Sequence, residues 1–386
     1  MAMAFSQPPV QRAVALHGLI RQHADDSERQ RRLHPEVAQA LAKSGLYRIA
    51  MPTDCFGEEV DPVSQIRTIE AVSKADGSAG WNLMIGIESF GLIGPAFKEC
   101  RELIEDPDVV ICGSTAAVGR ADRVDGGYRI NGQWQFVSGC HNATIFCATV
   151  SLFDNDEPVP GGINRYAILE LPDWEILDTW HVGGMRGSGS HDVRVTDVVV
   201  PQTRIVAPIG ATAHPSPLLR FPLAARLAYN KVGVSLGIAR AAIDAFVELA
   251  EGKTPRFTNK KLRDRSHAHI AVAEAEVRLR ACRALVLELA EAIWQAVLAD
   301  EVVSGKTRAL FQIACSDAAR GCSEAVDRVC EAAGTTANDL NHPLERMARD
   351  IRVVRQHLTV AALHIEDGGR MLLGLEPKQA MLKNLG

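Results

Sequence analysis

The chain has 386 residues, of which 47% are hydrophobic and 23% charged, which is the composition of a globular protein with a large buried core. Its net charge of −5 provides no basic excess for a nucleic-acid backbone, and no apolar run is long enough to cross a bilayer. We therefore expect neither nucleic-acid nor membrane binding, and the first residues, MAMAFSQPPVQRAV, do not resemble a secretion signal.

Cysteine and histidine are scattered through the chain. The nine cysteines include no C-x-x-C pair, and the twelve histidines include no H-x-x-x-H pair, so we expect no metal site. An odd number of unclustered cysteines is typical of reduced thiols, which predicts a cytoplasmic protein.

Residues 10–105 carry the apolar spacing of amphipathic helices, interrupted by the Pro- and Gly-containing run MPTDCFGEEVDP. Residues 108–210 change to short β-rich runs separated by turn signals such as DGG and LPDW. In DVRVTDVVV, alternation predicts a strand with one side formed by Val193, Val195, Asp197 and Val199, and the other by Arg194, Thr196, Val198 and Val200. The glycine-rich run from Gly184 to Gly189 leads into this strand and not into a helix. This order excludes a dinucleotide-binding loop, which would precede a helix.

From Pro217 onward the chain is again helical, with long segments predicted near 222–251, 261–300, 305–334 and 344–373. Four long helices with short connections predict a bundle. The sequence therefore predicts an α+β protein with an N-terminal helical domain (1–107), a central antiparallel β-barrel or sandwich domain (108–212) and a C-terminal four-helix bundle (213–386).

The segment DTWHVGGMRGSGSHDVRVTDVVVP resembles the "GxRGSGS…V.DV.VP" block of acyl-CoA dehydrogenase-like flavoproteins, especially their two-component flavin-dependent monooxygenase branch. ADGSAGWNLMIG and EAAGTTANDLNHPLERMARD resemble two further family motifs, and the resemblance extends through nearly the whole chain. It implies an acyl-CoA dehydrogenase-like fold, in which a β domain lies between two helical domains in the sequence.

The resemblance also implies residues that bind flavin. GYRINGQWQFVSGCHNA occupies the place of the strand that faces the reactive edge of the flavin ring, which makes Phe136, Val137 and Ser138 cofactor-binding candidates. The Ser138 hydroxyl would hydrogen-bond the flavin and take part in catalysis. The alternative is an ordinary turn serine at the end of a strand.

Two other segments are weaker candidates for the same cofactor. In ICGSTAAVGRA, Gly113 and Ser114 would present backbone amides to flavin, or would simply end a strand. Gly334 and Thr335 stand where relatives have a double glycine that reaches a neighbouring subunit's flavin. The nearby residues Arg346, Arg349 and Asp350 are interpreted as an ion network on a helix surface.

The identity of the acid/base residue distinguishes a dehydrogenase from a monooxygenase of this fold. Acyl-CoA dehydrogenases use a glutamate, but the corresponding places here hold Leu358 and Leu227–Ala228, which offer no carboxylate. RDIRVVRQH instead resembles the "RD…QH" pattern of the monooxygenases, which implies that His357 is catalytic. His364, seven residues later, is expected on nearly the same helix face and is a second candidate for contact with the substrate. The alternative is a solvated histidine on a helix.

The resemblance places substrate near the tryptophan helix, where Trp81 is a contact candidate. Glu88 occupies the position of a histidine in phenol hydroxylases of the branch. Its carboxylate would bind an amine or another cationic substrate, or would only cap the segment.

Together these features predict the oxygenase component of a two-component monooxygenase, which uses O2 to hydroxylate a small aromatic or amine substrate. The cofactor is reduced flavin, FADH2 or FMNH2, supplied by a separate NAD(P)H:flavin reductase, because no segment resembles a nicotinamide-binding unit. Relatives imply a homotetramer. The alternatives are an acyl-CoA dehydrogenase-like flavin oxidoreductase and a non-catalytic scaffold with the same fold.

Overall fold

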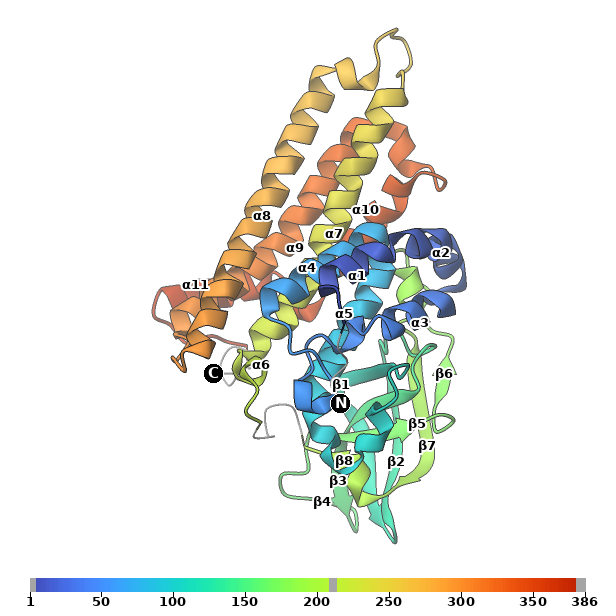
Figure 1. Ribbon diagram of the computed structural model, residues 1–386, viewed down its shortest axis with the longest axis vertical. Helices are drawn as coiled ribbons and strands as arrows, with labels where there is room; N and C mark the ends of the chain where they lie inside the picture. The colour runs from blue at the N-terminus through green and yellow to red at the C-terminus, as the bar shows by residue number, and fades with distance from the viewer. Residues whose placement is uncertain (1–4, 208–213, 380–386) are drawn as a thin grey trace. The chain divides into compact units, whose positions relative to one another are not determined.

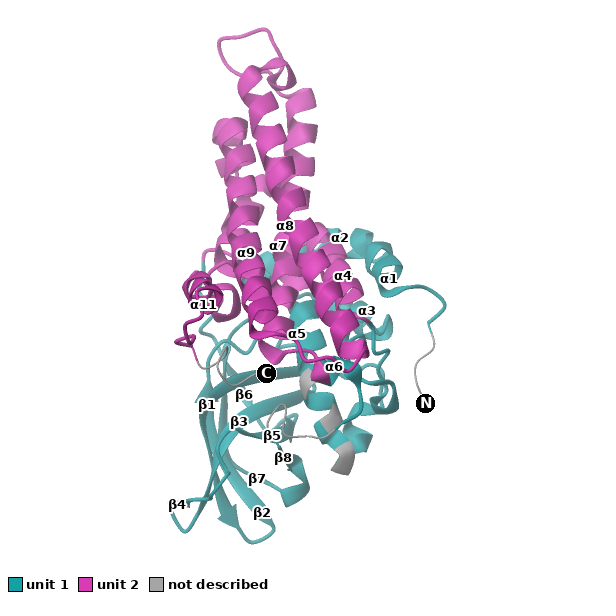
Figure 2. Ribbon diagram, turned by 90° about the vertical axis from the view of Figure 1, so that its left-hand side faces the viewer, with its two compact units in different colours: residues 1–60, 82–182, 186–219 teal, residues 61–81, 183–185, 220–386 magenta. Residues whose placement is uncertain are grey.

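The computed structural model describes residues 5–207 and 214–379. Its contacts divide the chain into two compact units, which Figure 2 colours separately. The sheet unit contains residues 1–60, 82–182 and 186–219, and the helical unit contains residues 61–81, 183–185 and 220–386. The expected boundary between residues 212 and 213 lies outside the described residues, and the division into three domains stays a prediction.

Helices precede the sheet, as the apolar spacing of residues 10–105 predicted. They are α1 (Pro9–Ala15), α2 (His17–Gln30), α3 (Pro35–Lys43), α4 (Pro62–Ala75) and α5 (Gly77–Ile93). α2 ends at Gln30, because the next residue, Arg31, has a left-handed backbone at φ 52°. α3 begins at Pro35, where the side chain of the preceding His34 accepts the Glu36 N–H. Residues 77–81 of α5 belong to the helical unit and the remainder to the sheet unit.

One eight-stranded sheet forms the β-rich region (Figure 1). Its strands are β1 (Ile111–Val124), β2 (Gly127–Trp134), β3 (Ile145–Asp154), β4 (Glu157–Pro158), β5 (Arg165–Glu170), β6 (Glu175–Leu177), β7 (Asp192–Val200) and β8 (Ile205–Val206). The hydrogen-bonded order is β6-β7-β2-β1-β3-β5-β8, with β4 beside β3. The prediction of a purely antiparallel domain was wrong, because β1 and β3 are parallel.

β7 spans the predicted residues, but its alternation is interrupted. Val193 and Val195 are buried as expected, whereas Val199 is 49% exposed and Val200 is buried. The register against β2 shifts by one residue between Gly132 and Ile130, so the two faces exchange beyond that point. Asp197, at φ 54°, forms this bulge, and its N–H donates to the Asn131 side chain.

The sheet core is built around large aromatic side chains. Trp134 is fully buried, packs edge-to-face on Phe146 at 5.4 Å between ring centroids, and donates its indole N–H to the Thr149 carbonyl. Phe146 also meets Trp174 edge-to-face, so three rings fill the interior next to the end of β2.

The helical unit is organised around α7 (Leu223–Gly252), which packs against α4, α8 (Ser266–Leu298) and α9 (Gly305–Ala333). Figure 1 shows α7, α8 and α9 as long helices side by side. Gly233 and Gly237 allow α4 to approach closely, because a Cβ at Gly237 would lie 2.5 Å from the Glu70 carbonyl oxygen. The short helix α6 (Pro217–Arg220) precedes α7, and all of its residues except Arg220 belong to the sheet unit.

The helix predicted over 344–373 is interrupted. The structure has α10 (Pro343–Val354), a 3₁₀ turn at Leu358–Val360 and α11 (Leu363–Leu372). The turn is fixed from both sides, because Gln312 of α9 donates to the Thr359 carbonyl and the Thr359 hydroxyl donates to the Leu227 carbonyl of α7. His357 therefore begins a turn and does not lie in a continuous helix.

Candidate functional site

The turn after β2 combines strain with exposure. The strand ends at Trp134, and Phe136 then adopts a left-handed backbone at φ 59° with its side chain 68% exposed. A non-glycine residue in this region is strained, and an exposed aromatic ring is removed from the core, so both observations point to a functional role. Phe136 contacts the buried Trp180 in a T-shaped arrangement, with ring centroids 6.2 Å apart.

Ser138 is buried beside Phe136 and belongs to a chain of three serines. Its Oγ lies 2.7 Å from Ser190 Oγ, which in turn lies 2.7 Å from Ser188 Oγ. Ser190 and Ser188 come from the glycine-rich segment before β7. Two sequence motifs that are far apart in the chain therefore meet at one hydroxyl cluster.

Backbone bonds hold the same two segments together. The Val137 N–H donates to the His191 carbonyl and the Gly139 N–H to the Ser188 carbonyl, each at 3.0 Å. Gly139 is left-handed at φ 78°, where a Cβ would lie 2.8 Å from the Asn82 side chain. The Val137 side chain is fully buried in the sheet core, which limits its proposed cofactor contact to the backbone.

Gly113 and Ser114 lie on β1 where its ladder to β3 becomes irregular. The register shifts between Ser114 and Gly119, and the Ser114 carbonyl accepts the Thr149 hydroxyl. A bulge in this position is a feature often found beside active sites, because it changes the direction of the backbone.

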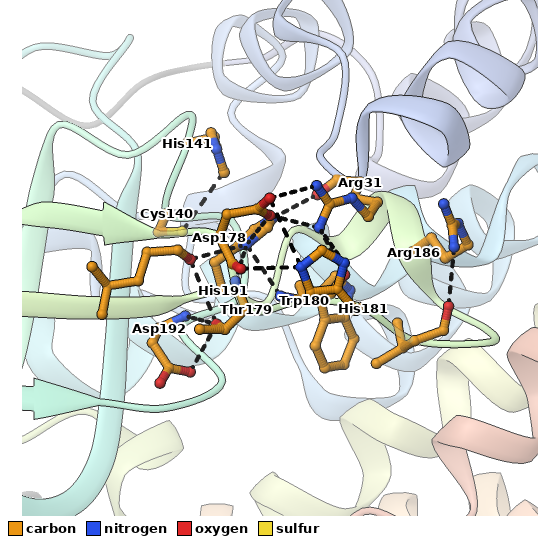
Figure 3. A network of polar contacts seen from close by, with 12 residues as sticks. Arg31, Cys140, His141, Asp178, Thr179, Trp180, His181, Arg186, His191 and Asp192 are labelled. Carbon is orange, nitrogen blue, oxygen red and sulfur yellow. Dashed lines mark hydrogen bonds and ion pairs between the residues drawn. The ribbon is translucent and has the colours of Figure 1, made fainter.

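A polar network on the same unit was missed by the sequence analysis (Figure 3). Asp178 pairs with Arg31 at 2.6 Å and lies 3.6 Å from His191. His191 accepts the Thr179 and Trp180 N–H groups at Nδ1 and donates from Nε2 to the Arg31 carbonyl. The only available signal was the polar run SHD after the glycines, because Arg31 and Asp178 are distant in sequence.

This network borders a cavity of about 350 Å³ lined by Gln30, Arg31, Arg32, His141, Ile176, Asp178 and His191. Burial, together with the positive charges of His191 and the two arginines, lowers the pKa of His141 to about 4. The ring is therefore neutral at physiological pH.

His357 begins the 3₁₀ turn of the helical unit. Its Nδ1 lies 3.0 Å from the Thr359 hydroxyl and 3.3 Å from the Thr359 N–H. The Thr359 N–H donates to Nδ1 and caps the start of the turn, so Nδ1 is the accepting nitrogen. The neutral imidazole therefore carries its proton on Nε2.

Two neighbours define the surroundings of His357. Trp81 packs edge-on against the imidazole, with ring centroids 5.5 Å apart, so the structure brings two predicted residues together. Burial, with a further contribution from the Lys231 charge, lowers the pKa of His357 to about 3. Lys231 lies on α7 and is itself buried.

The structure places the other predicted residues elsewhere. His364 is buried at the start of α11 and its Nε2 donates to the Leu358 carbonyl at 2.7 Å. The helix is broken between the two histidines, so the expectation that His364 shares a face with His357 was wrong. Glu88 is half-buried on α5 in the sheet unit, and its substrate role stays a prediction.

Gly334 and Thr335 follow the end of α9 and are exposed. Gly334 is left-handed at φ 64°, and Lys253 donates to the Ala333 carbonyl and the Thr336 hydroxyl at 2.6 Å each. These two bonds hold the turn in place, although no second glycine follows Gly334.

The expected surface ion network of Arg346, Arg349 and Asp350 was wrong for Asp350. Asp350 is buried and accepts the Met185 N–H at 2.6 Å, while Arg349 pairs with Glu345. A Cβ at Gly184 would lie 2.4 Å from the Arg349 carbonyl oxygen. These residues hold the first part of the glycine-rich segment in the helical unit.

Comparison with known proteins agrees with this arrangement. Residues 231–362 match the family model "Acyl-CoA dehydrogenase, C-terminal domain". The chain is 32% identical to indole-3-acetate monooxygenase of Pseudomonas putida over 351 residues, covering 91% of this chain and 90% of that protein. It is 28% identical to the FADH2-dependent resorcinol hydroxylase, oxygenase component, of Rhizobium sp. (strain MTP-10005), covering 96% and 95%.

A solved structure extends the likeness to three dimensions. The 3-HSA hydroxylase from Rhodococcus sp. RHA1 superposes with a TM-score of 0.86 at 26% identity, covering 97% of this chain and 99% of that one. The fold is thus acyl-CoA dehydrogenase-like. Within that fold, the chain belongs to the family of flavin-dependent monooxygenases. Among the described residues, no helix is long and apolar enough to span a membrane.

The low pKa of His357 predicts a pH-dependent stability. Because the folded pKa is about 3 and the unfolded value about 6.5, the unfolded chain binds more protons between these values. Stability from this group is present above about pH 6.5 and is lost as the pH falls toward 3.

We expect His357→Gln, which cannot titrate, to flatten the dependence of the unfolding free energy on pH between about 4 and 6.5. Urea unfolding at several pH values measures this, with exposed His267→Gln as the control. Equal pH slopes for His357→Gln and the unaltered chain would contradict the assignment.

Proposed function

We propose that this chain is the oxygenase component of a two-component monooxygenase, receives reduced flavin from a separate reductase and hydroxylates a small aromatic substrate with O2. The observation that carries this proposal is the exposed, strained Phe136 beside buried Ser138. Relatives named as monooxygenases of indole-3-acetate and resorcinol support the aromatic substrate class.

The residues of the turn fit a flavin ring. An exposed Phe136 offers an aromatic face, Ser138 offers a hydroxyl, and the irregular β1 backbone at Gly113–Ser114 offers further polar groups. Bound reduced flavin would supply the electrons that activate O2.

The serine chain orients the Ser138 hydroxyl. Ser190 has one hydroxyl proton and two serine neighbours, so it can accept from Ser188 and donate to Ser138. With this polarity Ser138 accepts from Ser190, and each bond in the chain strengthens the next. Burial keeps water from competing for the same hydroxyl.

His357 is proposed to act as the acid/base residue and to exchange a proton with the substrate at Nε2. The Thr359 N–H donates to Nδ1 and fixes the orientation of the ring. Burial, with a further contribution from the Lys231 charge, lowers the pKa of His357 and keeps the ring neutral before the reaction.

Assembly and location are part of the proposal. We propose a homotetramer in which Gly334–Thr335 of one subunit contributes to the flavin site of another, which the exposure and rigid presentation of that turn support. Nine unpaired cysteines support a reducing, cytoplasmic environment.

Ser138→Ala should uncouple the reaction. Losing a hydrogen bond of about 1.5–3 kcal/mol to a polarised group corresponds to roughly a tenfold to hundredfold change in rate. We expect H2O2 release to rise by that factor while the fold is retained, measured by peroxide assay during turnover with reduced flavin. Ser188→Ala removes the first donor of the chain but keeps the Ser138–Ser190 pair, so we expect a smaller rise. Equal peroxide release by Ser138→Ala and the unaltered chain would remove Ser138 from the mechanism.

His357→Ala should still consume reduced flavin and O2 but lose product by about 10²–10⁴-fold, because general acid–base catalysis is lost. Product is quantified by chromatography after single turnovers with a panel of phenols and indole carboxylates. We expect Thr359→Val to cause a smaller loss, since it removes the hydroxyl contacts to His357 and to the Leu227 carbonyl but keeps the imidazole. Normal hydroxylation by His357→Ala with a loss in His364→Ala would instead identify His364 as the acid/base.

A further inference from the structure

The corner between α2 and α3 in the sheet unit brings together side chains that ligate metals. His23 and Asp26 lie on α2, and His34 precedes α3. One ligand atom from each lies within 4.8 Å of the others. Two imidazoles and a carboxylate form a nitrogen and oxygen donor set that is typical of Zn²⁺ and similar divalent ions.

His23 points to a ligand because its own polar atoms are unsatisfied. The residue is only 9% exposed, and both ring nitrogens are buried without a hydrogen-bond partner. Such groups are unfavourable in a protein interior. Glu36 Oε2 lies 3.6 Å from His23 Nε2, which is too long for a hydrogen bond but close to the separation of about 3.4 Å between two ligands on a tetrahedral ion with bonds of about 2.0–2.1 Å.

The other members of the cluster are available for binding. His34 accepts the Glu36 N–H at Nδ1, so coordination through Nε2 moves the ring proton to Nδ1 and replaces this contact. The His23 and His34 rings stack with centroids 3.9 Å apart and planes at 16°, so one ring must rotate for both to share an ion. Asp26 pairs with Arg29, whose side chain is 74% exposed, and a surface ion pair of this kind is readily exchanged.

A second cluster in the sheet unit provides a contrast. Asp54, Cys55 and His214 also lie within ligand distance of one another. His214, however, accepts the Ser216 N–H at Nδ1 and contacts Asp54 with Nε2 at 3.1 Å each. Its imidazole is already satisfied by protein groups and needs no ion.

We propose that His23, His34 and Asp26, with Glu36 beside them, bind one divalent transition-metal ion, with Zn²⁺ the best match. The ion would link α2 to α3 and so fix the intervening corner, where Arg31 pairs with Asp178. It is a structural site, independent of the flavin chemistry. The spacing of histidines in the sequence did not predict it because the ligands come from two different helices.

The test is zinc titration of the full-length chain without an affinity tag, after removal of metals with a chelator. Calorimetry and thermal melting should show one Zn²⁺ bound per chain and a higher melting temperature, since an ion that binds only the folded state stabilises it. His23→Ala and His34→Asn should weaken binding by more than the tenfold to roughly hundredfold effect of outer-shell changes. Asparagine at position 34 retains a helix cap, which separates ligand loss from loss of the helix start.

His214→Asn is the matched control and should bind Zn²⁺ like the unaltered chain. Loss of binding in His214→Asn alone would place the ion at the Asp54 cluster and overturn the proposal. Absence of stoichiometric binding, or unchanged affinity in His34→Asn and Asp26→Asn, would also overturn it. Because Asp26 and His34 are partly exposed, these two variants decide the question even where His23→Ala does not fold.

Discussion

The pairing of the Phe136–Gly139 turn with the Arg186–His191 segment is the constraint on which the sheet unit's site depends. Two backbone bonds and the serine chain join these segments. At about 0.5–1.5 kcal/mol each, the three hydrogen bonds that cross between the segments together offset the roughly 1–3 kcal/mol that a left-handed Phe136 costs. The pairing thus keeps one aromatic ring in solvent and one hydroxyl buried beside it, which is the combination that a planar, polar-edged cofactor requires.

A similar principle operates in the helical unit. Thr359 bonds to α7 and α9 and thereby interrupts a sequence that otherwise has helical character. The interruption places the His357 imidazole beside Trp81, with Nδ1 accepting the Thr359 N–H. Buried Asp350 supports the same unit by holding the glycine-rich segment at Met185. In both units, the predicted functional residue lies where regular secondary structure ends.

Local patterns predicted much of the fold. The helical character of residues 10–105 and the β7 limits follow from apolar spacing and from period-two alternation, which neighbouring residues determine. The parallel β1–β3 pair, the bulge at Asp197 and the break after α10 depend on contacts with distant segments, so no local pattern revealed them. The site divides in the same way: motif resemblance identified Ser138 and His357, whereas Ser190, Thr359 and the Arg31–Asp178 pair act through contacts that are distant in sequence.

Anaerobic equilibrium dialysis with reduced and oxidised FMN and FAD tests the central claim most directly, because an oxygenase supplied by a separate reductase must capture flavin that is already reduced. The account predicts tighter binding of the reduced form, and a loss of roughly two- to tenfold in Phe136→Ala from about 0.5–1.5 kcal/mol of aromatic contact. Preferential binding of oxidised flavin, with bleaching of the yellow protein by an acyl-CoA, would contradict the account and identify a dehydrogenase.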